Sequence, residues 1–284
     1  MTMPSTAVRA GVRRGLIEFR KSLRAPEDLT YFLFGTAVFV FFMYINRDNE
    51  LRGTGGLTSA SFMFPGVLAF IIIFAGAFGL ATQVTTERED GTLLRMKSLP
   101  HGMAGYVVGQ ATRTSVEVLF NIVILTVPAM ILLDSLWLNG PAGALHVAAL
   151  VVLGLLACIP LGFAIGSVFK NPRAVSGWGL VVVSGLVAVS GIFFPVVALP
   201  EWAHGLIQLT PLYWLGLGMR EATLPDGAVV AELGESWRTL ETFGALGAWA
   251  VAGLLLAPVL LRRMARRESG SSVAQRQQEA LQRV

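Results

Sequence analysis

The stretch at residues 145–169 reads LHVAALVVLGLLACIPLGFAIGSVF and contains no Lys, Arg, Asp or Glu. A helix that crosses the hydrocarbon core of a bilayer needs about 20 predominantly apolar residues, so this stretch is long enough to span it. Backbone groups in lipid must find hydrogen-bond partners within their own segment, which favours a helix over an open strand. Five further stretches qualify in the same way: residues 29–45, 59–84, 116–138, 174–197 and 242–261. The sequence therefore predicts an all-α integral membrane protein with six transmembrane helices.

The composition agrees with this class. Apolar residues make up 54% of the 284 residues and charged residues only 14%, and the mean hydropathy is +0.64. A soluble domain carries about 25% charged residues, and a poorer surface would leave large apolar patches in water. The composition therefore excludes the soluble and disordered classes. The net charge of +4 does not point to nucleic acid, because excess Lys and Arg in a membrane protein reflects its topology.

The distribution of positive charge predicts the orientation. The N-terminal piece, the loops after the second and fourth spans and the C-terminal tail together hold 18 of the 22 Lys and Arg residues. Because such pieces stay in the cytoplasm, both termini are expected there, with the chain crossing the plasma (inner) membrane several times. We expect one domain over 1–284, made of an amphipathic N-terminal helix (1–28), a six-helix membrane domain (29–262) and a basic cytoplasmic tail (263–284).

The N-terminal segment has the pattern of a basic amphipathic helix. Apolar residues recur every three or four positions: Val8, Val12, Leu16, Phe19 and Leu23. Arginines follow the same rhythm about 100° away around the helix: Arg9, Arg13, Arg20 and Arg24. A helix of this kind lies in the membrane interface. It is expected to anchor the chain on the lipid surface, to contact a cytoplasmic partner, or to do both; a transit peptide fits less well, because Gly11 and Gly15 weaken the helix.

The loop after the second span is the most informative one, and residues 85–100 read TTEREDGTLLRMKSLP. Thr86 and Glu89 are three residues apart, the spacing of a capping box at a helix start. Acidic residues at the beginning and Arg95 and Lys97 further on complement the helix dipole, and Pro100 marks the end. We therefore expect a short charged helix between spans 2 and 3, which by composition alone is no more than a solvated loop.

This loop and two later segments resemble type-2 ABC transporter permeases. The family motif is matched by Glu87-Arg88-Glu89-Asp90-Gly91-Thr92-Leu93-Leu94, followed by Ser98-Leu99-Pro100. GIFFP at 191–195, LPEW at 199–202 and TPLY at 210–213, with Arg220 beyond, resemble the segment between the fifth and sixth spans of the family. Within it, the chain is most similar to the daunorubicin/doxorubicin-resistance permeases of actinobacteria, while related permeases carry lipids or glycans.

The resemblance implies the permease subunit of an exporter for a hydrophobic or amphiphilic, drug-like substrate, with a lipid or glycan precursor as the alternative cargo. The coupling helix that docks on a separate ATPase would be formed by Glu87, Arg88, Glu89, Asp90, Gly91 and Thr92. The chain has no Gly-x-x-x-x-Gly-Lys-Ser/Thr phosphate loop. ATP and Mg²⁺ are therefore expected on two copies of that ATPase, with no cofactor on this chain, and a second permease protomer, identical in a homodimer, completes the transporter.

These implications give an expectation for mutants and for the outer segment. Reversing Glu87 and Glu89 to Lys is expected to abolish transport while the permease stays folded. Residues 198–241 are too polar to span, and Trp and Tyr there favour the headgroup level. The plain expectation is one or two interfacial helices, and the resemblance adds that these helices dip back into the membrane and cap the exit.

Candidate residues of the substrate path lie in spans 2 and 5. Phe70, Phe74 and Phe78 share one face of span 2 and are suited to guiding a flat amphiphile, although lipid contact or helix packing more often explains such a face. The resemblance implies that spans 2 and 5 of two protomers enclose the path, which adds Ser184, Ser190, Phe193 and Phe194. Polar residues in span 3 either serve transport or reach interfacial water: Glu117, Asn121 and Asp134.

Two other classes of function compete. An intramembrane enzyme needs a nucleophile beside a base, but His146 lies at a helix end and no Gly-x-Ser-x-Gly occurs. An ion-coupled secondary carrier is expected to show inverted repeats, and the sequence shows none. A single cysteine, Cys158, allows no internal disulfide, and three widely separated histidines argue against a metal site.

Overall fold

The computed structural model describes residues 5–51, 56–133, 139–169 and 171–267, with 269–271, 274–275 and 278 of the tail. Within these residues all regular secondary structure is helical, apart from one isolated bridge between Glu50 and Thr58. Six helical stretches there are long and apolar enough to cross a membrane. The prediction of an all-α integral membrane protein with six spans is confirmed.

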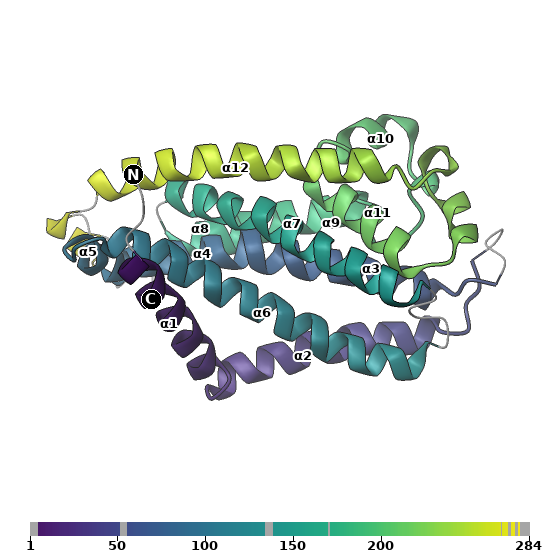
Figure 1. The fold of residues 1–284 in the computed structure, drawn as a ribbon, viewed down its shortest axis with the longest axis horizontal. Coiled ribbons are helices and arrows are strands. Elements are labelled where there is room, and N and C mark those ends of the chain that lie inside the picture. Colours follow the sequence, from purple (N-terminus) through teal and green to yellow (C-terminus); the bar gives the residue numbers. More distant parts are fainter. Residues whose placement is uncertain are drawn as a thin grey trace.

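The spans run roughly along the long axis of the molecule (Figure 1), and α1 (Ser5–Ser22) lies oblique to them. The first span is α2 (Pro26–Asn46). The second combines α3 (Ser59–Ile73), the π-helical turn η1 (Phe74–Gly79) and α4 (Leu80–Glu89). The third, fourth and last are α6 (Gly102–Leu132), α7 (Gly140–Val168) and α12 (Thr239–Arg267). The fifth span is formed by α8 (Pro172–Ala174), the π-helical turn η2 (Val175–Gly179) and α9 (Leu180–Val189).

The helix α7 is the centre of the bundle, because α12, α3, α4 and α11 (Pro211–Thr223) all pack against it. Glycines make the contact with the second span close. A Cβ at Gly162 would lie 2.5 Å from the backbone oxygen of Gly76, and one at Gly166 would lie 2.8 Å from the Val84 side chain. Larger residues at either glycine would therefore push α7 away from the second span.

Two span boundaries differ most from the sequence prediction. The third span begins at Gly102 instead of residue 116, because its helix continues beyond the apolar stretch toward the end of the molecule where α5 (Thr92–Lys97) lies. The fifth span ends at Val189 instead of residue 197. Gly191 takes a left-handed φ of 68°, which only glycine adopts readily, and this turn stops the helix. Asp134 lies outside the described residues.

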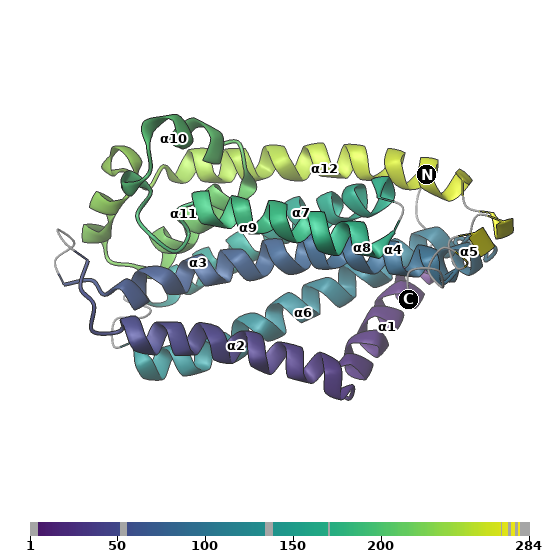
Figure 2. The same cartoon turned by 180° about the vertical axis from the view of Figure 1, so that it is seen from behind.

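The segment before the last span forms the end of the molecule opposite to α5 (Figure 1). It contains η3 (Val196–Ala198), α10 (Glu201–Ile207), α11, η4 (Asp226–Ala231) and η5 (Leu233–Glu235). The helix α11 packs against α3, α7 and α12 and is almost wholly buried. In contrast, α10 lies at the surface of the molecule (Figure 2). Trp202 and Leu206 of α10 are exposed, and so is Leu209 just after it. The expected pair is therefore one re-entrant helix, α11, and one interfacial helix, α10.

Candidate coupling site

The predicted coupling residues straddle a sharp turn instead of forming one helix. Glu87, Arg88 and Glu89 are the last residues of α4, the long second span. The chain turns at Asp90 and at Gly91, whose φ is 79°, and α5 begins at Thr92. We call residues 80–101 the α4–α5 hairpin. The Asp90 Oδ1 atom accepts a hydrogen bond from the Thr92 backbone N–H at 2.8 Å, so this carboxylate caps the turn.

The capping box expected at Thr86 and Glu89 is wrong. The Thr86 hydroxyl donates to the backbone oxygen of Thr82 at 3.0 Å, one turn earlier in the same helix. A threonine inside a helix makes this bond as readily as a threonine at a helix start makes a cap. The separate charged helix is therefore α5 alone, and its polar start is Asp90–Thr92.

Arg88 joins the hairpin to α7 through hydrogen bonds. Its side chain is buried, and its Nη1 atom donates to the backbone oxygens of Gly166 at 3.0 Å and Phe169 at 2.5 Å. The last carbonyls of a helix lack partners within the helix, and a cation at that end is favourable. Arg88 thus caps the C-terminus of α7 from a neighbouring span, which is a structural role inside the permease.

Glu87 joins the hairpin to α6 and α1 through polar contacts. Only 6% of it is exposed. Its Oε1 atom accepts hydrogen bonds from Gln83 at 2.9 Å and from Gln110 of α6 at 2.8 Å, and the Arg14 Nη2 atom of α1 lies 3.8 Å away. The Arg14 guanidinium also lies over the ring of the buried Tyr106, 5.6 Å from its centroid. Three helices therefore share one buried polar cluster at the base of the hairpin.

The helix α1 packs on α6 through glycines. A Cβ at Gly11 would lie 2.7 Å from the backbone oxygen of Gly105, and one at Gly15 would lie 2.4 Å from that of Gly109. Small residues four apart on both helices allow this approach. Gly11 and Gly15, expected to weaken the helix, are therefore its contact surface with α6. The four predicted interface arginines are all exposed: Arg9, Arg13, Arg20 and Arg24.

The tip of the hairpin is what remains accessible to a partner. Asp90, Arg95, Lys97 and Leu99 are exposed, Leu99 by 54%. The chain reverses sharply beyond Leu99, because a Cβ at Gly102 would lie only 1.9 Å from the backbone oxygen of Met96. Of the predicted coupling residues, Asp90 is exposed and Glu89 and Thr92 are half-buried, whereas Glu87, Arg88 and Gly91 are buried.

The phenylalanines predicted for the substrate path gather in one ring cluster. The ring centroids of Phe70 and Phe74 lie 5.2 Å apart, and those of Phe74 and Phe78 lie 5.0 Å apart. Phe193 lies 6.2 Å from Phe70, and Phe39 of α2 lies 5.7 Å from Phe70. The cluster joins spans 1 and 2 and the turn after span 5. Phe39 was missed because its own segment is rich in aromatic residues without a distinctive spacing.

The other path candidates lie apart from this cluster. Ser190 is buried and its hydroxyl donates to the backbone oxygen of Val187 at 2.9 Å, so it holds the turn at the end of α9. Ser184 is exposed on α9, and Phe194 is half-buried. The Asn121 side chain of span 3 donates to the backbone oxygen of Glu117 at 2.8 Å, which satisfies its amide within the helix.

A buried ion pair at the opposite end was not foreseen. Arg220 of α11 and Glu232 are 0% and 1% exposed, and the Nε and Nη2 atoms of Arg220 both donate to the Glu232 carboxylate. The Nη1 atom donates to the backbone oxygen of Gly191 at 3.3 Å, and the guanidinium lies 5.1 Å from the Phe62 ring centroid. Arg220 thus fixes the re-entrant helix to the end of the fifth span and to the start of α3.

An apolar groove of about 500 Å³ runs between α6, α7 and α12. Its walls include Leu119, Leu155, Phe163 and Leu254, and Ser115 contributes the one polar side chain. The groove can hold an apolar chain and offers almost nothing to a polar or charged ligand.

These features define a class. The protein is an all-α integral membrane protein with six spans. A short helical hairpin braced by buried polar contacts lies at one end of it, and the buried helix α11 lies at the other. Among the described residues, no group of three or more His, Cys, Asp or Glu is placed to hold a metal ion.

The chain belongs to the ABC-2 transporter family, whose family model matches residues 44–258. The match includes the hairpin, the ring-cluster residues Phe70, Phe74, Phe78 and Phe193, and α11. It begins after α1 and leaves out Phe39 of the ring cluster. No curated protein is similar enough to the chain to count as a match. Members of the family are membrane-embedded permeases that work with an ABC ATPase, so this protein is a multi-pass permease subunit of an ABC transporter.

Proposed function

We propose that this permease exports a hydrophobic or amphiphilic, drug-like compound and that the partner ATPase drives it through the tip of the α4–α5 hairpin. The observation that carries the proposal is the contrast within the hairpin. Its tip is exposed, while its base is held by Arg88 on α7 and by Glu87 on α6 and α1. A push on such a braced element moves whole spans instead of bending a loop.

The charge distribution supports the orientation. The basic helix α1, the hairpin and the end of α12 with Arg262, Arg263 and Arg266 lie toward the same end of the molecule (Figure 1). Positive segments remain in the cytoplasm. In the proposed arrangement this end, with both chain termini, faces the cytoplasm, the protein resides in the plasma membrane, and ATP and Mg²⁺ bind on two ATPase subunits.

The fifth span supports a second protomer. Of the six spans, the fifth is the least buried by the rest of the protein. Its side chains Trp178, Val181 and Val182 are 71%, 63% and 58% exposed. Gly179 of its π-helical turn meets Phe78, whose Cε2 atom would lie 2.9 Å from a Cβ there. A homodimer formed across this face places the ring cluster of each protomer beside the dimer axis. Flat aromatic walls suit a planar amphiphile, which favours a drug-like substrate over a glycan precursor.

The test replaces the exposed leucine at the tip. Leu99→Asp is expected to weaken association with the ATPase about thirtyfold, because it puts a charge where an apolar anchor is buried in the complex. Co-purification of the ATPase and permease-stimulated ATP hydrolysis measure the effect. Leu206→Asp on α10 is the matched control, since Leu206 is 56% exposed at the opposite end. Equal association by the parent chain and Leu99→Asp would exclude the tip as the docking site.

A further inference from the structure

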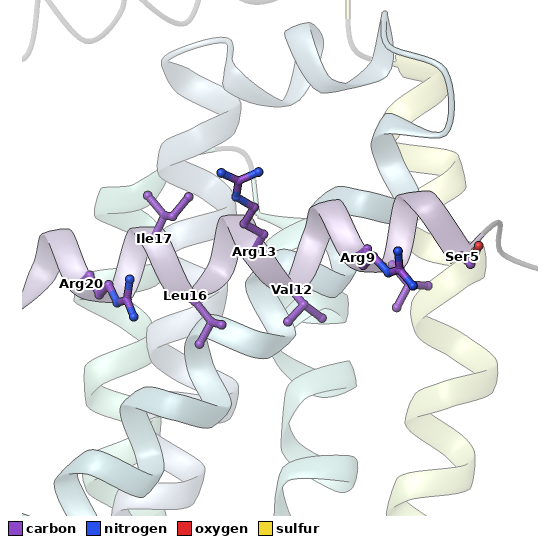
Figure 3. A pocket seen from close by; sticks show the side chains of 8 residues that line it. Ser5, Arg9, Val12, Arg13, Leu16, Ile17 and Arg20 are labelled. Carbon is purple, nitrogen blue, oxygen red and sulfur yellow. The ribbon is translucent and has the colours of Figure 1, made fainter.

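We propose that the outer face of α1 binds the headgroups of anionic phospholipids. We define this arginine face by three cations and three apolar residues: Arg9, Arg13, Arg20, Val8, Val12 and Leu16. A shallow open pocket of about 740 Å³ lies over it. Figure 3 shows Val12 and Leu16 pointing to one side of the helix, Arg13 to the other, and Arg9 and Arg20 beside them.

The three arginines carry charge that the protein does not neutralise. All are exposed, and none makes an ion pair with any residue that the structure describes. The neighbouring Arg14 differs, because it pairs with Glu18 at 2.6 Å and points to the buried cluster. Glu18 is the one acidic residue of α1. The face therefore attracts anions, and a guanidinium matches a phosphate in two parallel hydrogen bonds.

The apolar residues identify the anion as part of a lipid. Val8, Val12 and Leu16 are 38%, 37% and 41% exposed beside the arginines. Because α1 leads into the first span at Pro26 within a few residues, it lies at the membrane surface. There the apolar side chains reach the acyl boundary while the arginines stay at the level of the phosphates. An acidic protein surface would match the charges but not the apolar strip beside them.

The opposite side of α1 is already occupied, which fixes the orientation of the arginine face. Gly11 and Gly15 lie on α6, and Arg14 faces Glu87. The inference rests on the proposed function only in placing α1 at the cytoplasmic surface. Vesicles with identical leaflets and the permease alone test it, so that the result does not depend on orientation or on the ATPase.

The experiment measures which lipid surrounds α1. A fluorophore is attached at Ile17→Cys, next to the arginine face, and the one native cysteine, Cys158, is fully buried and does not react. The permease is placed in phosphatidylcholine vesicles that contain a minor fraction of phosphatidylglycerol. Quenching is compared between vesicles in which the same fraction of either lipid is brominated. Brominated phosphatidylglycerol is expected to quench about threefold more strongly, and high salt is expected to reduce the difference.

Matched variants locate the effect. Arg9→Gln, Arg13→Gln and Arg20→Gln together are expected to make the two lipids quench equally, and glutamine keeps the helix propensity. The control is a triple variant at the end of α12: Arg262→Gln, Arg263→Gln and Arg266→Gln. It is expected to keep the stronger quenching by brominated phosphatidylglycerol. Equal quenching by both lipids in the parent chain, or a preference that survives the first triple variant, would overturn the proposal. Loss of all lipid quenching when the ATPase is added would assign the face to a protein partner and also overturn it.

Discussion

Arg220→Met is expected to destabilise the permease by about 3–5 kcal/mol, the typical cost of leaving one partner of a buried ion pair alone. Arg220 and Glu232 are almost fully inaccessible, so neither water nor another cation compensates for the loss. The substitution also removes the donor to the Gly191 backbone oxygen, which fixes α11 to the end of the fifth span. Thermal unfolding of the purified permease in detergent, followed by circular dichroism, measures the loss.

Two further variants distinguish the loss of the ion pair from a general effect of replacing an arginine by methionine. Arg220→Met combined with Glu232→Leu is expected to recover most of the stability, because no isolated charge remains buried. Arg47→Met is the matched control, since Arg47 is 41% exposed and pairs with the exposed Asp48. Its effect is expected to stay within about 1 kcal/mol. A double variant as unstable as Arg220→Met alone would show that the arginine contributes through packing and not through its charge.

Glu87→Lys is expected to destabilise the base of the hairpin by about 3–5 kcal/mol. A lysine there faces Arg14 and cannot accept the hydrogen bonds that Gln83 and Gln110 donate. This expectation differs from the one drawn from the sequence, in which reversing Glu87 and Glu89 leaves the permease folded. The amount of monodisperse protein after heating in detergent measures the effect.

The amide variant and a surface variant complete this comparison. Glu87→Gln keeps a side-chain oxygen for the two donors and is expected to cost about 1 kcal/mol. Asp48→Lys also reverses a carboxylate, but the Asp48 side chain is 85% exposed, so little change is expected. If Glu87→Lys proved as stable as Asp48→Lys while transport was lost, Glu87 would be a docking residue after all.

The spans could be predicted from the sequence because lipid sets their length and apolar character. Their ends could not be predicted as well, since local geometry decides them. The fifth span stops at the left-handed turn of Gly191. The third span begins before its apolar stretch, because its helix continues toward the end of the molecule where polar residues are tolerated.

The site was harder to predict because its decisive contacts join residues far apart in the sequence. Arg88 was identified as a motif residue, but its bond to the Gly166 carbonyl depends on where α7 ends. The contact between α1 and α6 could be predicted in part from the sequence, because Gly11 and Gly15 have the same four-residue spacing as Gly105 and Gly109. The pairing of Arg220 with Glu232 was not, because both lie in a segment whose polarity suggested exposure to water.

The account depends on the tip of the hairpin facing the cytoplasm, and thiol labelling tests this directly. Ser98→Cys at the tip and Gly205→Cys on α10 are both exposed positions, and Cys158 is fully buried. With a reagent that does not cross membranes, Gly205→Cys is expected to react in intact cells and Ser98→Cys only after the cells are opened. Labelling of Ser98→Cys in intact cells would contradict the account.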